Sequence, residues 1–171
     1  CFITGHDPET GVELWRTATL AEPGTPEYAS WGNVAPDRRG GGDIWIAGSY
    51  DPELDLVYFG TSQPKPWAAP SRGMSVEDAA LYTNATLAVR PKTGELVWHF
   101  QHIPGETIDM EVGFERILAD IGDEQTLLTV GKDGILWKLD RATGDYLDLF
   151  DTMDQTIFEV NRDTGQLSYR E

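Results

Sequence analysis

A group of acidic side chains set among apolar neighbours is the first feature of the sequence that could perform chemistry. Asp109 and Glu111 are separated by a single residue, and Glu115 follows shortly after them. Such a cluster either binds a hard cation, which prefers oxygen ligands, or supplies a general base. A solvated acidic loop explains the same residues equally well, because the chain contains 29 acidic residues in all.

An aromatic ring, an amide and a basic side chain stand near the ends of other expected strands. The glycine run 40–42 allows the backbone to approach another group closely, and Trp45 follows it at the expected start of a strand. Gln63 comes after the aromatic and β-branched strand 56–59 and directly before a proline. Lys132 lies in a Lys-Asp-Gly turn between two strands, where a lysine is by default an exposed charge.

A strand–turn–strand unit with a Thr-Gly turn recurs along the chain and indicates how the strands are organised. The glycine supplies the positive φ that the turn requires, and an Asp or Asn at the start of the turn can bond to the turn's own backbone. The tryptophan that follows, Trp15 or Trp98, is expected to pack between neighbouring sheets. The units occupy residues 7–15, 90–98, 140–147 and, more weakly, 161–167.

Repeated units of this kind predict an all-β fold, a β-propeller of four-stranded blades with tryptophan-docking repeats. At about 40–50 residues a blade, residues 1–171 form one partial β-propeller domain of roughly three to four blades. Trp31 lies in a long loop, where it either covers a site or plugs the surface. Local patterns predict hairpins at 1–20 and 80–103, two strands at 44–62, and loops at 21–43 and 63–79.

The charge of the chain limits its partners. The formal net charge is −16, which argues against nucleic acid and against an anionic membrane surface. An acidic face could steer a basic partner such as a cytochrome, although many solvated surfaces are simply acidic. No apolar run reaches the length of a membrane span. The chain starts at Cys1 rather than at a methionine, so we expect a piece of a longer chain.

Other common site chemistries find no support in the sequence. The glycine run 40–42 opens a strand rather than a helix, so it is neither a P-loop nor a dinucleotide fingerprint. The three histidines lack zinc-site spacing, and no nucleophile elbow occurs. Asn84 begins a glycosylation sequon, a match that often arises by chance.

The motifs together resemble the pyrroloquinoline quinone (PQQ) dependent alcohol dehydrogenases, including the methanol dehydrogenase type. The resemblance is carried by G-G-G-x-x-W, by S-Y-D-P-E-L-D-L-V-Y-F-G-T, and by the amide and proline that follow. It implies that Trp45 stacks on the quinone plane. Gln63 stands where the family normally has an Asn that coordinates the metal, so the oxygen donor is retained. The family fold is an eight-bladed propeller.

A second stretch extends the resemblance to the acidic cluster. The family pattern H-x-P-N-D-x-W-D-[YFL]-[DA] places its catalytic base on Asp109, and Glu111 stands where lanthanide-using members carry a second acid. Lys132 corresponds to the residue that bonds the reactive carbonyl oxygen of the quinone. The sequence departs from the pattern with Ile108 in place of Trp and with Gly-Glu at 105–106 in place of Asn-Asp.

The resemblance implies a fragment of a PQQ-dependent dehydrogenase that oxidises an alcohol or sugar hydroxyl by hydride transfer to PQQ. A calcium or lanthanide ion, held by Gln63, Asp109 and Glu111, is the implied Lewis acid. The implied partners are a cytochrome c as electron acceptor, and the missing blades of the parent chain or self-association. The implied location is periplasmic or otherwise extracytoplasmic, and the isolated chain is expected to be inactive. The alternative is a non-catalytic β-propeller scaffold or binding protein with PQQ-like repeats.

Overall fold

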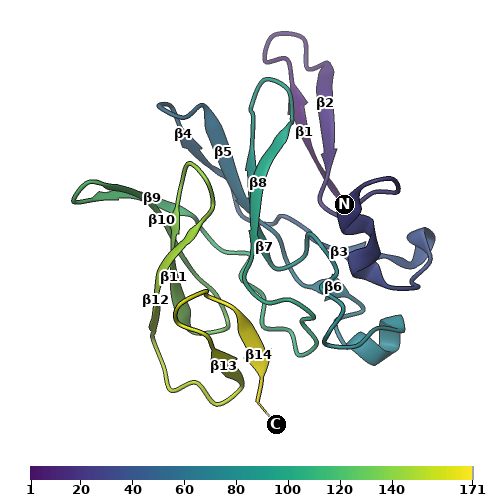
Figure 1. The fold of residues 1–171 in the computed structure, drawn as a ribbon. Helices are drawn as coiled ribbons and strands as arrows, with labels where there is room; N and C mark the ends of the chain where they lie inside the picture. Colours follow the sequence, from purple (N-terminus) through teal and green to yellow (C-terminus); the bar gives the residue numbers. More distant parts are fainter. Residues whose placement is uncertain (171) are drawn as a thin grey trace.

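Two four-stranded antiparallel sheets form the centre of the molecule (Figure 1). The structure is a computed structural model, and it describes residues 1–170. The first sheet has the order β4-β5-β7-β8 and the second the order β12-β11-β10-β9. The strands of the first sheet are β4 (Ser49–Asp51), β5 (Leu56–Gly60), β7 (Ala85–Val89) and β8 (Leu96–Gln101). Those of the second are β9 (Ile117–Ile121), β10 (Glu124–Val130), β11 (Ile135–Asp140) and β12 (Tyr146–Asp151).

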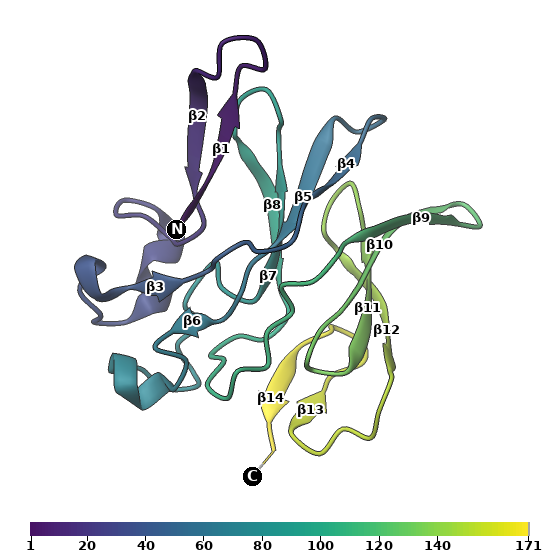
Figure 2. The ribbon, with the colours of Figure 1, turned by 180° about the vertical axis from the view of Figure 1, so that it is seen from behind.

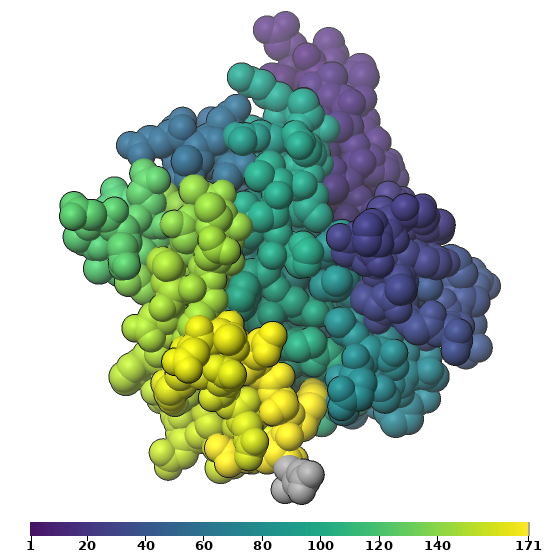
Figure 3. Space-filling model, in the orientation of Figure 1, coloured from purple at the N-terminus to yellow at the C-terminus, as the bar shows by residue number. Residues whose placement is uncertain are grey.

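A two-stranded hairpin flanks the pair of sheets on each side. The hairpin β1 (Phe2–His6) and β2 (Glu13–Ala18) lies beside the first sheet, and β13 (Phe158–Val160) and β14 (Leu167–Tyr169) lie beside the second (Figure 2). A short ladder joins β3 (Gly40–Gly41) to β6 (Pro64–Lys65). In the space-filling view the β1–β2 hairpin projects from one end of the molecule and the β13–β14 hairpin covers the other (Figure 3). The predicted all-β class is therefore confirmed.

The burial of the strands follows the alternation in the sequence. In β11, Ile135, Trp137 and Leu139 are buried while the residues between them are partly exposed, as the period of two in a strand requires. Every residue of β7 is buried, because this inner strand has covered surfaces on both faces. The apolar residues form three core clusters, of which the second lies between the two sheets and contains Tyr58 and Trp98.

In each of the first three Thr-Gly units, the aromatic residue packs on the Thr-Gly turn of the next unit. A Cβ added to Gly94 would lie 2.4 Å from the ring of Trp15, and one added to Gly144 would lie 2.4 Å from the ring of Trp98. Trp15 Nε1 also donates a hydrogen bond to the carbonyl of Pro91, at 2.9 Å. Glycine is required in these turns because the neighbouring ring occupies the space of a side chain. The predicted packing of Trp15 and Trp98 between neighbouring sheets is confirmed.

The third contact of this series uses a tyrosine. A Cβ on Gly165 would lie 2.5 Å from the ring of Tyr146, whose hydroxyl donates to Arg162 O at 2.9 Å. Pro91 and Arg162 occupy the same position in their turns, three residues before the glycine. The hairpins and sheets are thus linked in sequence order by one repeated contact.

Several local expectations were wrong. Trp45 does not start a strand. It lies in the segment 42–48 between β3 and β4, and this segment begins with a turn at Gly42, whose φ is 63°. Trp31 neither covers a site nor plugs the surface, because it is fully buried in the first core cluster and its Nε1 donates to Leu81 O. The second predicted hairpin begins at Ala85 rather than at residue 80.

The two predicted loops contain short helical turns. A proline stands in the first turn of each of these 3-10 helices, where its fixed φ and missing N–H are tolerated. No helix within residues 1–170 is long and apolar enough to cross a membrane. The helices are η1 (Pro26–Trp31), η2 (Pro36–Arg38) and η3 (Ala69–Arg72).

Candidate functional site

Three of the residues singled out in the sequence form one charged cluster. The residues between β8 and β9, which we call the carboxylate loop (102–116), carry Asp109 and Glu111. The turn between β10 and β11 carries Lys132. Lys132 Nζ lies 3.2 Å from Asp109 Oδ2 and 3.1 Å from Glu111 Oε1. The lysine is therefore not a free turn charge, and the carboxylates are not a free acidic loop.

A glycine allows the turn and the loop to come this close. A Cβ on Gly131 would lie 2.7 Å from Glu111 O and from Val112 Cα, so no other residue fits at this position without displacing the loop. The backbone N–H of Lys132 donates to Glu111 O at 3.1 Å. Partial burial lowers the pKa of Lys132, but the hydrogen bonds and charges of Glu111 and Asp109 outweigh it and raise that pKa above its ordinary value.

The two carboxylates differ in their access to solvent. The side chain of Asp109 is 47% exposed and that of Glu111 is 12% exposed. Asp109 can therefore meet a ligand that enters from solvent, whereas Glu111 is largely buried. Asp109 has a φ of 66°, a left-handed conformation that non-glycine residues adopt rarely.

Trp45 lies against the same carboxylate loop. Its ring meets Phe114 edge to face, with ring centroids 5.0 Å apart and planes at 81°. A Cβ on Gly113 would lie 3.2 Å from Trp45 Nε1, so the absence of a side chain there lets the indole approach the loop. Trp45 remains 47% exposed, which leaves ring surface for a planar ligand.

Gln63 lies between β5 and β6, directly before β6, and presents a buried amide oxygen. The residue is 9% exposed, and its Oε1 has no hydrogen-bond partner within residues 1–170. Thr61, two residues earlier, has its carbonyl oxygen 3.5 Å from the position of a Cβ on Gly113. This places the amide segment beside the carboxylate loop, although no hydrogen bond joins Gln63 to Asp109 or Glu111 in the described part of the chain.

Asn84 connects the amide segment to the carboxylate loop, a role that sequence reasoning missed. Its Oδ1 accepts the N–H of Val112 at 3.1 Å, and its own N–H donates to Ser62 O at 3.0 Å. The residue is fully buried, so the sequon that it begins is not a surface acceptor. Its φ of 49° is tolerated by asparagine more readily than by most residues. No local pattern in the sequence marks such a residue.

A buried arginine beneath the aromatic pair was also missed. Arg116 donates from Nε to Thr86 Oγ1 at 3.0 Å and from Nη1 to Phe114 O at 2.5 Å, and this second bond fixes the ring that meets Trp45. Burial lowers the pKa of Arg116 to about 9. The same Thr86 hydroxyl bonds His102 Nε2 at 2.8 Å, and burial lowers the pKa of that histidine. His102 is therefore structural.

The donor set suits a hard cation but is incomplete within this chain. Two carboxylates and the orphaned amide oxygen of Gln63 are oxygen donors, the type that calcium and lanthanide ions prefer. Residues 1–170 contain no group of three or more acidic, histidine or cysteine side chains that could hold a metal. The residues present fit a cation that takes further ligands from elsewhere.

Comparison with known proteins identifies the family. Residues 1–165 match the family model for the PQQ-dependent glucose/ethanol/alcohol dehydrogenase β-propeller domain. The chain is 33% identical over 162 residues to quinohemoprotein alcohol dehydrogenase ADH-IIG of Pseudomonas putida, covering 85% of this chain and 22% of that protein. The chain therefore belongs to the PQQ-dependent alcohol dehydrogenase propeller family, as the sequence motifs indicated.

Solved structures of relatives superpose on nearly the whole chain. The structure of ADH-IIG from Pseudomonas putida HK5 matches with a TM-score of 0.84 at 29% identity, over 99% of this chain and 27% of that one. Quinohemoprotein alcohol dehydrogenase from Comamonas testosteroni gives 0.81 at 26%, over 99% and 27%. A europium-containing methanol dehydrogenase gives 0.74 at 26%, over 88% and 29%. The two sheets are thus propeller blades, and the chain spans about a quarter of these proteins.

Proposed function

We propose that this chain forms part of the active-site wall of a PQQ-dependent dehydrogenase that oxidises an alcohol or sugar hydroxyl. The observation that carries the proposal is the cluster of Asp109, Glu111 and Lys132, whose loop also packs against a half-exposed Trp45. A propeller scaffold needs no half-exposed base, buried acid and lysine in mutual contact beside an indole.

Asp109 is the proposed general base. Its carboxylate is half exposed, so it can reach the hydroxyl of a substrate and accept the proton at Oδ1 or Oδ2. Lys132 orients the carboxylate, because its ammonium lies 3.2 Å from Oδ2. The same ammonium is available to donate to an oxygen on which negative charge develops.

Trp45, Gln63 and Glu111 complete the proposed binding surface. The exposed indole supports a flat ring by stacking, and Gln63, Asp109 and Glu111 offer oxygen ligands to a calcium or lanthanide ion. When bound, PQQ supplies the hydride acceptor and the cation supplies Lewis-acid polarisation. The second carboxylate, Glu111, favours the more highly charged lanthanide ion, and one relative of known structure contains europium.

The proposal also covers the remaining blades, the electron acceptor and the cellular location. The relatives are several times longer, which supports an eight-bladed propeller in which other blades cover the exposed apolar residues Phe2 and Phe150. The missing blades of the parent chain, or self-association, would supply that cover. The quinohemoprotein names of the relatives support a cytochrome c or a haem domain as electron acceptor. Membership of this family supports a periplasmic or otherwise extracytoplasmic location.

The test is a calorimetric titration of the folded protein with PQQ, in calcium and separately in lanthanum. Saturable binding that depends on the metal is expected, with loss of binding in Asp109→Asn. The matched control is Asp123→Asn, which changes an exposed aspartate in the turn between β9 and β10 and should bind as the unsubstituted protein does. Because residues 1–170 supply only part of the donor set, the titration is repeated on the longer parent chain, and absence of binding by the folded parent in both metals would contradict the proposal and favour the scaffold.

A further inference from the structure

Glu106 occupies an unusual place in the carboxylate loop. It is fully buried, although glutamate is rarely buried without a specific partner. Its Oε1 accepts the backbone N–H of Ile108 at 2.6 Å and that of Met110 at 2.9 Å. These two donors are the neighbours of Asp109 on either side, so one carboxylate oxygen stabilises the turn that contains the proposed base.

The conformation of this turn depends on its hydrogen bonds to Glu106. Asp109 has a φ of 66°, a left-handed conformation that aspartate tolerates more readily than most L residues, and the bonds of its two neighbours to Glu106 hold it there. Burial raises the pKa of Glu106, against the hydrogen bonds from Met110 and Ile108 and the charge of Arg72. Both the neutral and the ionised form can accept at Oε1, so the bonds at that oxygen rather than the charge define what this residue does for the turn.

Arg72 ties the same turn to the segment that follows Gln63. Its Nη1 donates to the carbonyls of Pro66 and Trp67, at 2.9 Å and 2.5 Å, and its Nη2 donates to Glu106 O at 2.6 Å. Arg72 is buried, so these bonds are shielded from water. One guanidinium therefore fixes the position of the turn that carries Asp109 relative to the segment that follows Gln63.

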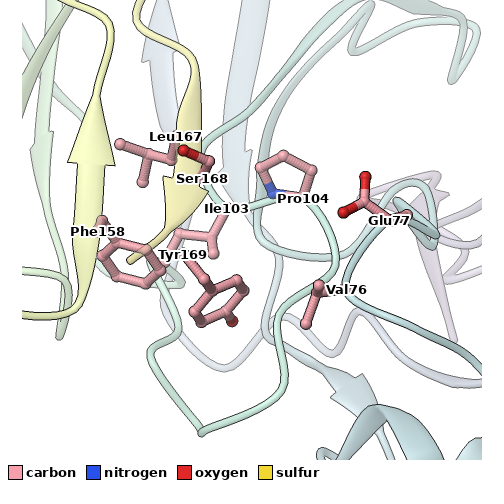
Figure 4. Close-up of a pocket in the computed structure, with 8 residues that line it drawn as sticks. All are labelled: Val76, Glu77, Ile103, Pro104, Phe158, Leu167, Ser168 and Tyr169. Carbon is pink, nitrogen blue, oxygen red and sulfur yellow. The ribbon is translucent and has the colours of Figure 1, made fainter. Parts of the chain in front are cut away.

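Two further bonds anchor the next residue of the turn. Thr107 Oγ1 accepts the N–H of Ala69 at 2.7 Å, and the N–H of Thr107 donates to Tyr169 Oη at 3.1 Å. Tyr169 comes from β14 and lines a cavity of about 240 Å³ with Val76 and Pro104 (Figure 4). The turn is thus held from η3 and from the last hairpin, with Glu106 at the centre.

We propose that Glu106 is the positioning residue of the site. Its carboxylate fixes the 107–110 turn so that Asp109 faces Lys132, while its backbone carbonyl accepts from Arg72, which links that turn to the segment after Gln63. The inference rests on the proposed function, because it assumes that Asp109 and Gln63 serve one bound cation. Glu106 touches neither of these side chains, so it acts on the cation only through the backbone.

The test measures cation affinity directly, with Tb³⁺ as the probe and tryptophan-sensitised emission as the readout. Glu106→Gln keeps an oxygen at the accepting position and should change the Tb³⁺ dissociation constant less than about 3-fold. Glu106→Met keeps the length but removes both acceptors, and should weaken binding by about 10-fold or more. The control is Val89→Ala, a buried change at the far end of β7, whose melting temperature should fall while its Tb³⁺ affinity stays within about 3-fold.

The variants separate the role of Glu106 from the proposed function. Unchanged affinity in Glu106→Met, or an equal loss in Val89→Ala, would overturn the inference while leaving the proposed function standing. Equal affinity in Asp109→Asn and the unsubstituted protein, or no binding by the folded parent chain, would overturn the proposed function and the inference with it. Amide exchange in the unsubstituted protein needs no variant: the N–H groups of Ile108 and Met110 should be protected, and exchange at the unprotected rate would also overturn the inference.

Discussion

Replacing Gly144 by alanine should disrupt the contact that joins the two blades. The new Cβ would lie 2.4 Å from Trp98 Cε3, well inside van der Waals contact, and the backbone φ is 79°. The left-handed φ costs an alanine about 1–2 kcal/mol, and overpacking against the ring costs about 1–3 kcal/mol more. We therefore expect Gly144→Ala to lower the free energy of unfolding by about 2–5 kcal/mol.

The chain contains a matched control for the backbone term. Gly11 stands at the same position of the first Thr-Gly turn with a φ of 72°, but nothing lies within 4 Å of its added Cβ. Gly11→Ala should therefore cost only the backbone term, about 1–2 kcal/mol. Gly94→Ala, whose Cβ would lie 2.4 Å from Trp15, should behave like Gly144→Ala.

Urea denaturation, followed by tryptophan fluorescence and circular dichroism together, measures the three variants. With an m-value of about 2 kcal/mol/M, an extra 2 kcal/mol moves the midpoint by about 1 M. Equal losses in Gly144→Ala and Gly11→Ala would refute the reasoning, because the ring contact would then contribute nothing to the linkage between blades.

Three further predictions concern single side chains. Burial raises the pKa of Asp133 to about 6, so the folded state binds this proton more tightly than the unfolded chain does. Protonation of Asp133 therefore stabilises the folded state as the pH falls from 7 towards 4, and this stabilisation is lost as the pH rises through about 6. Asp133→Asn should remove this pH-dependent part of the unfolding free energy, which amounts to up to about 3 kcal/mol. If the variant kept the same difference in urea stability between pH 7 and pH 4.5 as the unsubstituted protein, the reasoning would be contradicted. Tyr58→Phe should cost about 1 kcal/mol in the same assay, because the buried hydroxyl donates to Arg141 O at 2.8 Å; a neutral result would contradict the stabilising role of this bond. Lys132→Met should strengthen binding of Tb³⁺ alone by about 10-fold, since a lysine and a cation compete for the same carboxylates, and should weaken binding of PQQ; weaker Tb³⁺ binding would show that the lysine does not compete.

The repeated part of the fold could be predicted from the sequence because its signal is local. Each Thr-Gly turn needs a glycine of positive φ, and the aromatic residue after it has a fixed partner in the next unit. These constraints recur at known spacing, so the strands, the turns and the packing of Trp15 and Trp98 could be anticipated. The number of blades in the domain, three to four, remains a prediction.

The irregular segments could not be predicted because tertiary contacts decide them. Trp45 follows a glycine run that suggested a strand, but the backbone turns at Gly42, and within residues 1–170 the segment 42–48 forms no strand. Glu106 and Arg116 are charged residues that composition assigns to the surface, yet both are buried by contacts with residues far away in the sequence. Family motifs drew attention to Asp109, Glu111 and Lys132, and the structure brings them together, while their roles remain predictions.

The most direct test of the central claim is the anomalous scattering of a lanthanide in crystals of the protein grown with PQQ. We expect an anomalous peak from a lanthanide ion coordinated by Asp109 Oδ and Glu111 Oε, with the amide oxygen of Gln63 turned towards the ion and the quinone lying on Trp45. A peak elsewhere on the acidic surface, with Lys132 still bridging the two carboxylates and no ring on Trp45, would contradict it.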